Sequence, residues 1–115
     1  MRIRVIFALV DDDRQDEVIK KAKEAGATGV TILNARGEGI HKKTSFLGLE
    51  MESHKEALLF LVEEHISDEI MDAIYEAGHF REKGAGVAFC WTVDRAIGLE
   101  SQIKKLEEEA RSRYF

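Results

Sequence analysis

The 115-residue sequence has a single cysteine, Cys90, and no apolar run that approaches the length of a membrane span. One cysteine cannot form the intrachain disulfide framework that holds many small secreted domains together. A spanning helix needs roughly 20 mostly apolar residues, and a secretory signal needs a basic start, an apolar stretch and a small-residue cleavage site. Neither pattern occurs, so we expect a cytoplasmic protein that does not itself span a membrane.

The sequence also has fewer basic than acidic residues. Lys and Arg total 17 against 22 Asp and Glu, which gives a net charge of −5. Nonspecific binding to nucleic acid requires a basic face, so we do not expect nucleic acid as a partner. A small local basic site for phosphate groups remains compatible with this balance.

The familiar catalytic motifs are missing as well. No serine stands in a nucleophile elbow, and Cys90 lies in the middle of an expected strand, where it is typical of a small core residue. The carboxylates fall on expected helix faces and turns, where solvation is their ordinary state. We therefore do not expect an enzyme.

What the sequence does contain is an internal repeat with an offset of 52 residues. Segments 8–26 and 60–78 align without a gap and are identical at seven of nineteen positions. Each copy has the pattern of a strand, an acidic turn, a helix and a glycine stop, and another apolar strand follows it. The repeat predicts two βαβ units.

The hydrophobic spacing predicts the element boundaries. We expect Asp12 or Asp13 to cap the first helix, which ends at Gly26, and Ser67 to cap the second, which ends at Gly78. The expected elements are strands over 2–10, 29–36, 56–64 and 86–93, a first helix directly after the aspartates, a second helix over 68–77, and an amphipathic helix over 99–111.

Right-handed crossovers in both units place the two helices on one face of a four-stranded antiparallel sheet. The fold class is therefore α+β, a ferredoxin-like (βαβ)2 sandwich with an added C-terminal helix. We expect one domain over 1–115, with an insertion at 39–55 and a helical extension at 98–115. The second sheet face would expose apolar residues such as Phe89 and Trp91, so we predict an oligomer that buries it.

The connection between the second and third strands is the first candidate functional segment. About seventeen residues intervene there, from Gly39 to Lys55 inclusive, and loops of this length are usually functional. Apolar residues among basic ones suggest a surface that docks on a partner. The candidate partner-binding residues are His41, Lys42, Lys43, Phe46, Leu47, Leu49 and Met51.

Two glycine pairs form the second candidate. The segments 37–39 and 84–86 both read Gly-x-Gly, and His79, Arg81 and Lys83 precede the second pair. Glycines allow close backbone approach and leave amide groups free to bind anions. Together with the cations, they indicate a site for a phosphate-bearing ligand.

Three stretches of this sequence resemble the PII nitrogen-regulatory signal-transduction proteins. Residues 29–39 are similar to the family's second strand and the glycines that begin its T-loop, 46–51 to the tip of that loop, and 84–90 to its B-loop. With the duplicated framework, the resemblance extends over about residues 1–97. The order and spacing of the three stretches are more specific than any one of them.

The resemblance implies a non-enzymatic homotrimer that binds an adenine nucleotide (ATP, ADP or AMP) as effector in clefts between subunits. Its T-loop would regulate a partner, such as a membrane transporter or a nitrogen-assimilation enzyme. By position, the resemblance assigns nucleotide contacts to Thr31, Gly37, Glu38, Gly39, Gly84, Ala85, Gly86 and Val87, beside the Arg81 and Lys83 noted above.

Departures from the family pattern are equally informative. Phe46 and Met51 replace both T-loop tyrosines, and Leu49 occupies the position of a phosphorylatable serine, so modification there is not expected. Val87 replaces the B-loop lysine, and the stretch 96–101 lacks two arginines that grip phosphates. Each charge-assisted contact is worth roughly 1.5–3 kcal/mol. The sequence thus predicts a divergent PII-like member with weakened ATP binding.

Two alternatives come from other classes. A metal-responsive trimer of the copper-tolerance type shares this fold and would use His41 and His54 as ligands. Cysteines or closely spaced histidines, typical of structural zinc sites, are absent around them. A small ferredoxin-like enzyme is the third reading, which the missing catalytic motifs disfavour.

Overall fold

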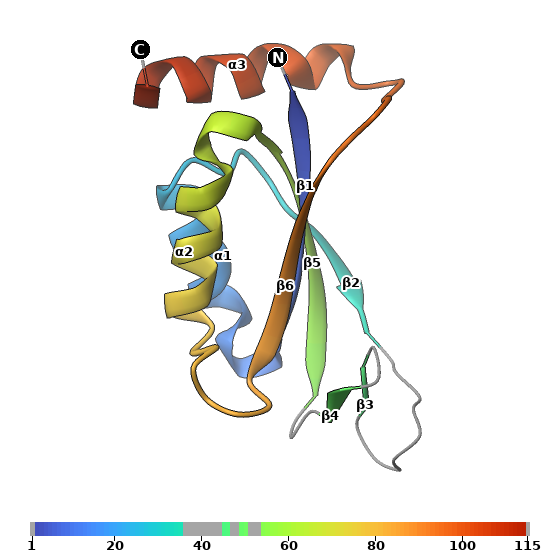
Figure 1. Cartoon of the computed structure of the whole chain (residues 1–115), viewed down its shortest axis with the longest axis vertical. Coiled ribbons are helices and arrows are strands. Elements are labelled where there is room, and N and C mark those ends of the chain that lie inside the picture. Colours follow the sequence, from blue (N-terminus) through green and yellow to red (C-terminus); the bar gives the residue numbers. More distant parts are fainter. Residues whose placement is uncertain (1, 36–44, 47–48, 51–53, 115) are drawn as a thin grey trace.

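Two nine-residue strands, β1 (Ile3–Asp11) and β5 (Lys55–Glu63), form the centre of the sheet in the computed structural model. The structure describes residues 2–35, 45–46, 49–50 and 54–114. The central strands pair antiparallel along their whole length. Two edge strands, β2 (Thr31–Asn34) beside β5 and β6 (Gly86–Thr92) beside β1, complete the order β2-β5-β1-β6 (Figure 1). This order confirms the ferredoxin-like fold.

Strand β2 is shorter than predicted, because 29–30 and 35–36 were expected to belong to it and it holds only four residues. Two further strands, β3 (Ser45–Phe46) and β4 (Leu49–Glu50), lie within the segment 39–55. They pair with each other as a separate two-stranded sheet. The sequence pattern did not predict this small ribbon.

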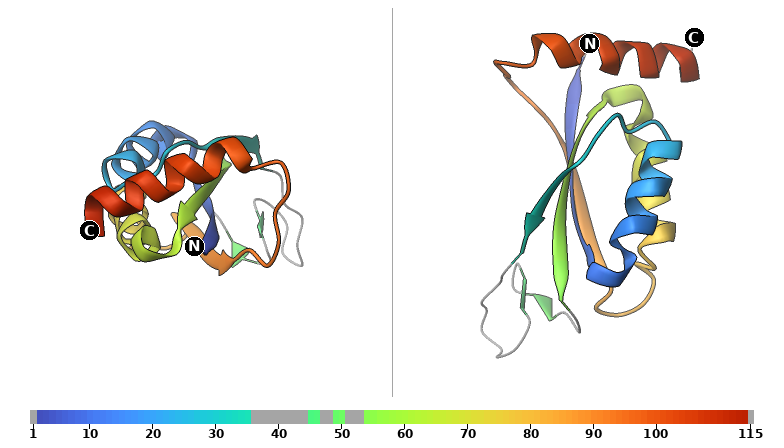
Figure 2. Two further views of the ribbon diagram at one scale, coloured as in Figure 1. Left: turned by 90° about the horizontal axis from the view of Figure 1, so that it is seen from above. Right: turned by 180° about the vertical axis from the view of Figure 1, so that it is seen from behind.

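Helices α1 (Gln15–Glu24) and α2 (Ser67–Ala77) cover one face of the sheet, as Figures 1 and 2 show from opposite sides. Alternate strand residues meet the apolar stripes of these helices, since side chains alternate between sheet faces. The largest buried members of this core are Ile6 and Val10 of β1, Leu58, Phe60 and Val62 of β5, Val18 of α1, Ile66 just before α2, and Ile70 and Ile74 of α2.

The predicted helix caps are wrong. Asp12 and Asp13 lie in a 3-10 turn, η1 (Asp12–Arg14), and no side-chain hydrogen bond caps α1. A matching turn, η2 (Glu64–Ile66), precedes α2, so Ser67 is the first residue of the helix rather than its cap. The amide of Ser67 donates a hydrogen bond to the carbonyl of Glu64, so the turn satisfies this donor at the start of the helix. The Ser67 hydroxyl donates to the same carbonyl at 2.9 Å.

Both helices stop at the predicted glycines, but in different ways. Gly26 follows α1 with φ of +122°, whereas Gly78 caps α2 with φ of −82° and His79 takes the positive φ of 56°. When the two copies are aligned at the offset of 52 residues, α2 therefore ends one residue later than α1. Gly78 must still be small, because a Cβ there would lie 2.4 Å from the ring of Phe80.

The C-terminal helix α3 (Glu100–Tyr114) lies across the end of the sheet at which β1 begins and β6 ends (Figure 2). Leu106 and Ala110 are buried, and Nη2 of Arg113 donates to the carbonyl of Glu24 at 2.9 Å. The amphipathic helix expected over 99–111 is thus confirmed, and it packs on its own chain. None of the helices in the described residues is long and apolar enough to cross a membrane.

The sheet face opposite α1 and α2 is apolar, and no helix covers it within the described ranges. Leu33, Phe89 and Trp91 point to this face, and 46, 45 and 47% of their surfaces are exposed. Phe7 packs against Phe89 there, with ring centroids 6.5 Å apart. We call this surface the open face; the predicted bare sheet face is present.

Candidate functional site

The predicted ligand-binding residues that the structure describes fall into two groups on opposite edges of the sheet. Thr31 begins β2 and pairs with Leu59 of β5, whereas Val87 lies in β6 and pairs with Leu9 of β1. Neighbouring strands are about 4.8 Å apart, so the three spacings between β2 and β6 separate these edges by about 14 Å. Thr31 and Val87 cannot contact the same group of a small ligand within one chain.

The edge beside Thr31 holds a cavity of about 450 Å³. Its walls come from the start of β2, the open face of β1 and β5, and one side of α3. It is lined by Val5, Thr28, Gly29, Val30, Thr31, Leu59, Phe60, Leu61, Gln102 and Leu106. None of these side chains is charged, so the cavity is suited to a neutral group.

The opposite edge begins with the turn from α2 into β6, residues 78–86. Hydrogen bonds from the amides of Glu82 and Ala85 to the carbonyls of His79 and Glu82 hold this turn, at 2.9 and 3.2 Å. Gly84 has φ of 77°, which disfavours other residues. A Cβ on Gly86 would lie 2.3 Å from the carbonyl oxygen of Leu9. Both glycines therefore also have a purely structural reason to be present.

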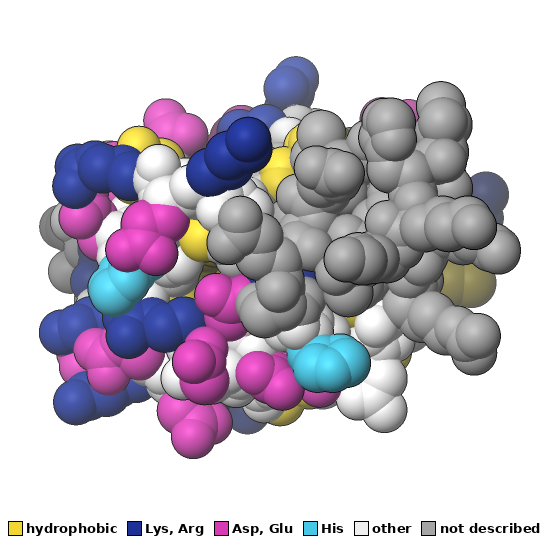
Figure 3. All heavy atoms as spheres, turned by 90° about the horizontal axis from the view of Figure 1, so that it is seen from below, with side chains coloured by type: hydrophobic (Ala, Val, Ile, Leu, Met, Phe, Trp, Pro, Cys, Tyr) yellow, Lys and Arg dark blue, Asp and Glu magenta, His cyan; other side chains and the backbone are white. Residues whose placement is uncertain are grey.

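The cations near this turn are not equally available. Nη2 of Arg81 lies 2.9 Å from the carboxylate of Glu76, and its guanidinium lies 5.4 Å from the centre of the Tyr75 ring. Lys83 is exposed and forms no ion pair with another described residue. His79 Nε2 lies 2.8 Å from Nη2 of Arg14. At this end of the molecule, acidic and basic side chains intermix in the part not drawn in grey (Figure 3).

Comparison with known proteins places this arrangement in a family. The family model for nitrogen regulatory protein P-II matches residues 3–102. The chain belongs to the P-II family. The nitrogen regulatory protein GlnK2 of Haloferax mediterranei is 30% identical to it over 104 residues, 86% of this chain and 85% of that protein.

A solved structure shows the same fold. The crystal structure of a protein described as PII-like and signalling, from Thermus thermophilus, superimposes with a TM-score of 0.60 at 20% identity. The match covers 81% of this chain and 87% of that one. P-II proteins are regulators rather than enzymes, so membership places this chain in a signalling and regulatory family.

Most of the predicted partner-binding loop of this P-II protein lies outside the described residues, namely His41, Lys42, Lys43, Leu47 and Met51. The predicted nucleotide-binding residues Gly37, Glu38 and Gly39 also lie outside them. Phe46 and Leu49 are described as a backbone pair between β3 and β4. His54 is exposed at the start of β5, where its carbonyl accepts a hydrogen bond from the amide of Asp12 at 3.1 Å.

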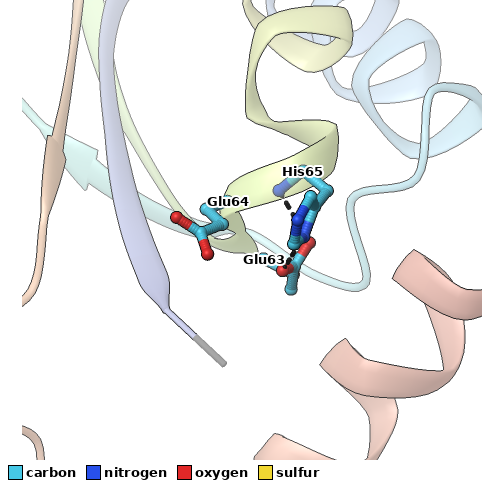
Figure 4. A group of neighbouring side chains, drawn as sticks. All are labelled: Glu63, Glu64 and His65. Atoms are coloured by element: carbon cyan, nitrogen blue, oxygen red, sulfur yellow. Dashed lines mark hydrogen bonds and ion pairs between the residues drawn. The ribbon is translucent and has the colours of Figure 1, made fainter. Parts of the chain in front are cut away.

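Within the described residues, one cluster has ligand atoms close enough for a metal ion. Glu63, Glu64 and His65 offer atoms within 4.8 Å of one another at the end of β5 remote from the loop (Figure 4). The Glu63 carboxylate already accepts the amide of His65 at 2.7 Å and contacts its Nδ1 at 2.5 Å. The cluster is thereby used to hold the junction between β5 and η2.

Cys90 lies on the helix-facing side of β6 and packs against the core, as predicted. Burial raises the pKa of its thiol above the ordinary value, although the charge of Arg4 and a hydrogen bond with Ser67 work in the opposite direction. A nucleophilic cysteine needs a depressed pKa. The raised pKa and the packing against the core therefore favour a structural role for Cys90 over a nucleophilic one.

Proposed function

We propose that this protein is a non-enzymatic signal-transduction regulator that binds a small effector, an adenine nucleotide, between the subunits of a homotrimer. One observation carries the proposal. The half-site around Thr31 and the half-site over 83–87 lie on opposite edges of one sheet, about 14 Å apart by strand spacing. Packing the β2 edge of one subunit against the β6 edge of the next joins the two halves.

The open face supports assembly into a closed ring. A monomer that exposed Leu33, Phe89 and Trp91 together would leave a large apolar patch in water, and such patches mark interaction surfaces. Identical subunits that meet through two different edges form a ring when their rotation closes. Three copies arranged in this way bury Leu33, Phe89 and Trp91 of their open faces and form a composite site at each junction.

Segment 39–55 then carries the ligand state to a partner. It follows β2 in the chain and ends at Lys55, the first residue of β5, whose fully buried side chain pairs with Asp11 at the end of β1. A ligand held beside Thr31 thus acts on the strand that leads into the segment. We propose a membrane transporter or a nitrogen-assimilation enzyme as the regulated partner, docked through 41–51.

Isothermal titration tests the ligand. We expect binding of at least one of ATP, ADP or AMP by the wild-type protein, and a loss of affinity in Thr31→Val, which removes a hydroxyl from one half-site. Absence of binding for all three nucleotides, with saturable binding of copper or zinc instead, would overturn the proposal in favour of a metal-responsive protein.

Light scattering after size exclusion tests the assembly. We expect a trimer for the wild type and dissociation in Trp91→Glu, which places a charge on the open face. Tyr75→Glu is a matched control, because Tyr75 is 42% exposed on α2 and lies away from the open face. A monomeric wild type at micromolar concentration would contradict the composite site.

A further inference from the structure

The cavity beside Thr31 is closed on one side by the C-terminal helix. Gln102 and Leu106 are four residues apart, so they share one face of α3, and both line the cavity with Thr28 and Thr31. Leu106 is 3% exposed, whereas Gln102 is exposed. Leu106 therefore lies deep in the wall, and the Gln102 amide lies at its outer part.

This wall is fixed to the rest of the chain. Ala110 is buried one turn beyond Leu106, and Arg113 donates to the carbonyl of Glu24 at the end of α1. The amide of Gln102 has only a 3.5 Å contact with Ser101 Oγ among the described residues. The side-chain nitrogen and oxygen of Gln102 are thus available to a ligand. They lie on a helix that is already docked and does not need to reorganise.

The lining identifies the chemistry that fits. Leu59, Leu61 and Leu106 provide apolar surface, and Thr28, Thr31 and Gln102 provide hydrogen-bonding groups at its margin. A volume of about 450 Å³ falls within the range of small-molecule sites. Since no charged side chain among the described residues lines the cavity, a phosphate there would lose hydration without compensation from these residues. An uncharged group with an apolar surface and hydrogen-bonding edges fits this lining, and a nucleobase is such a group.

We propose that α3 is a wall of the effector site and determines its specificity. Leu106 packs against the base and the amide of Gln102 hydrogen-bonds to its edge, so that the site selects nucleosides and nucleoside monophosphates over di- and triphosphates. The inference rests on the proposed binding of a nucleotide between subunits. The opposite half-site supports the preference, because Arg81 is paired with Glu76 and Lys83 is the cation without an ion pair among the described residues of that turn.

Titration of adenosine, AMP, ADP and ATP into the full-length protein tests the proposal. We expect affinity to fall as phosphates are added beyond the first. Gln102→Ala should weaken AMP binding by about fivefold, the equivalent of one neutral hydrogen bond. Lys104→Ala is the matched control, because Lys104 lies on the opposite side of α3 and should bind AMP as the wild type does.

The outcomes separate this inference from the proposed function. Tighter binding of ATP than of AMP, or unchanged AMP binding by Gln102→Ala, overturns the inference and leaves nucleotide regulation standing. Failure of all four ligands to bind overturns both. Circular dichroism of each variant, with helix content equal to that of the wild type, shows that any loss comes from the removed side chain rather than from unfolding of α3.

Discussion

The guanidinium of Arg14 donates two hydrogen bonds to the carbonyl oxygen of Ala77, from Nε at 3.2 Å and from Nη2 at 2.9 Å. Arg14 immediately precedes α1, and Ala77 is the last residue of α2. A cation at a helix C-terminus also interacts favourably with the partial negative charge there. The contact joins the start of one helix to the end of the other and positions the turn that leads into β6.

Removing this contact should destabilise the fold. We expect Arg14→Ala to lower the free energy of unfolding by roughly 1.5–3 kcal/mol, the range for hydrogen bonds to charged groups, and the lower end is expected because Arg14 is partly exposed. Urea denaturation at one fixed protein concentration measures it. Lys20→Ala, which removes an exposed cation from α1, should change stability by less than about 0.5 kcal/mol. Equal losses in the two variants would show that the carbonyl contact contributes nothing.

Gly26 should tolerate no larger residue. Its φ is +122°, and a Cβ there would lie 2.6 Å from Nε of Arg113 and 3.0 Å from Cδ1 of Ile66. Gly26→Ala therefore strains the backbone and displaces Arg113, and we expect a cost of about 1–3 kcal/mol in thermal or urea unfolding. Gly29→Ala is the control, because no atom of the described residues lies within 4 Å of its Cβ position. A stable Gly26→Ala variant with α3 still docked would contradict this account.

Two neighbouring cations should differ in their effect on nucleotide binding. Arg81 is held by Glu76 and the Tyr75 ring, whereas Lys83 forms no ion pair with another described residue. We expect Lys83→Ala to weaken AMP binding by about tenfold, the loss of one charge-assisted contact, and Arg81→Ala to weaken it by much less. Isothermal titration at constant ionic strength compares the two. A larger effect at Arg81 would mean that it leaves Glu76 to reach the ligand.

The thiol of Cys90 should react slowly. Burial raises its pKa, so less thiolate is present at a given pH than in the unfolded chain. Reaction with Ellman's reagent at pH 8 should be much slower for the native protein than in guanidinium chloride. Because the pKa is raised on folding, the associated stability is fully present below the thiol's ordinary pKa and is lost as the pH rises through the folded value. Equal rates in both states would contradict this burial.

Sequence reasoning predicted the scaffold because its causes are local. The repeat, the alternating strands and the stripes through Val18 and Ile70 each follow from spacing along the chain. The helix caps were predicted wrongly because the acidic turn of each copy is a 3-10 turn, η1 or η2, and no side chain caps the helix that follows it. The pocket wall was missed for another reason. Gln102 and Thr31 line the same cavity only because α3 docks there, and the two residues are far apart in sequence.

The placement of Thr31 and Val87 on opposite edge strands has a genetic consequence. In the proposed ring, a subunit with a defective β2 edge and a subunit with a defective β6 edge are each inactive as pure trimers. When they assemble together, every mixed ring has one junction at which an intact β2 edge meets an intact β6 edge. Two loss-of-function alleles of this protein would then complement each other in the same cell, whereas two alleles damaged at the same edge would not.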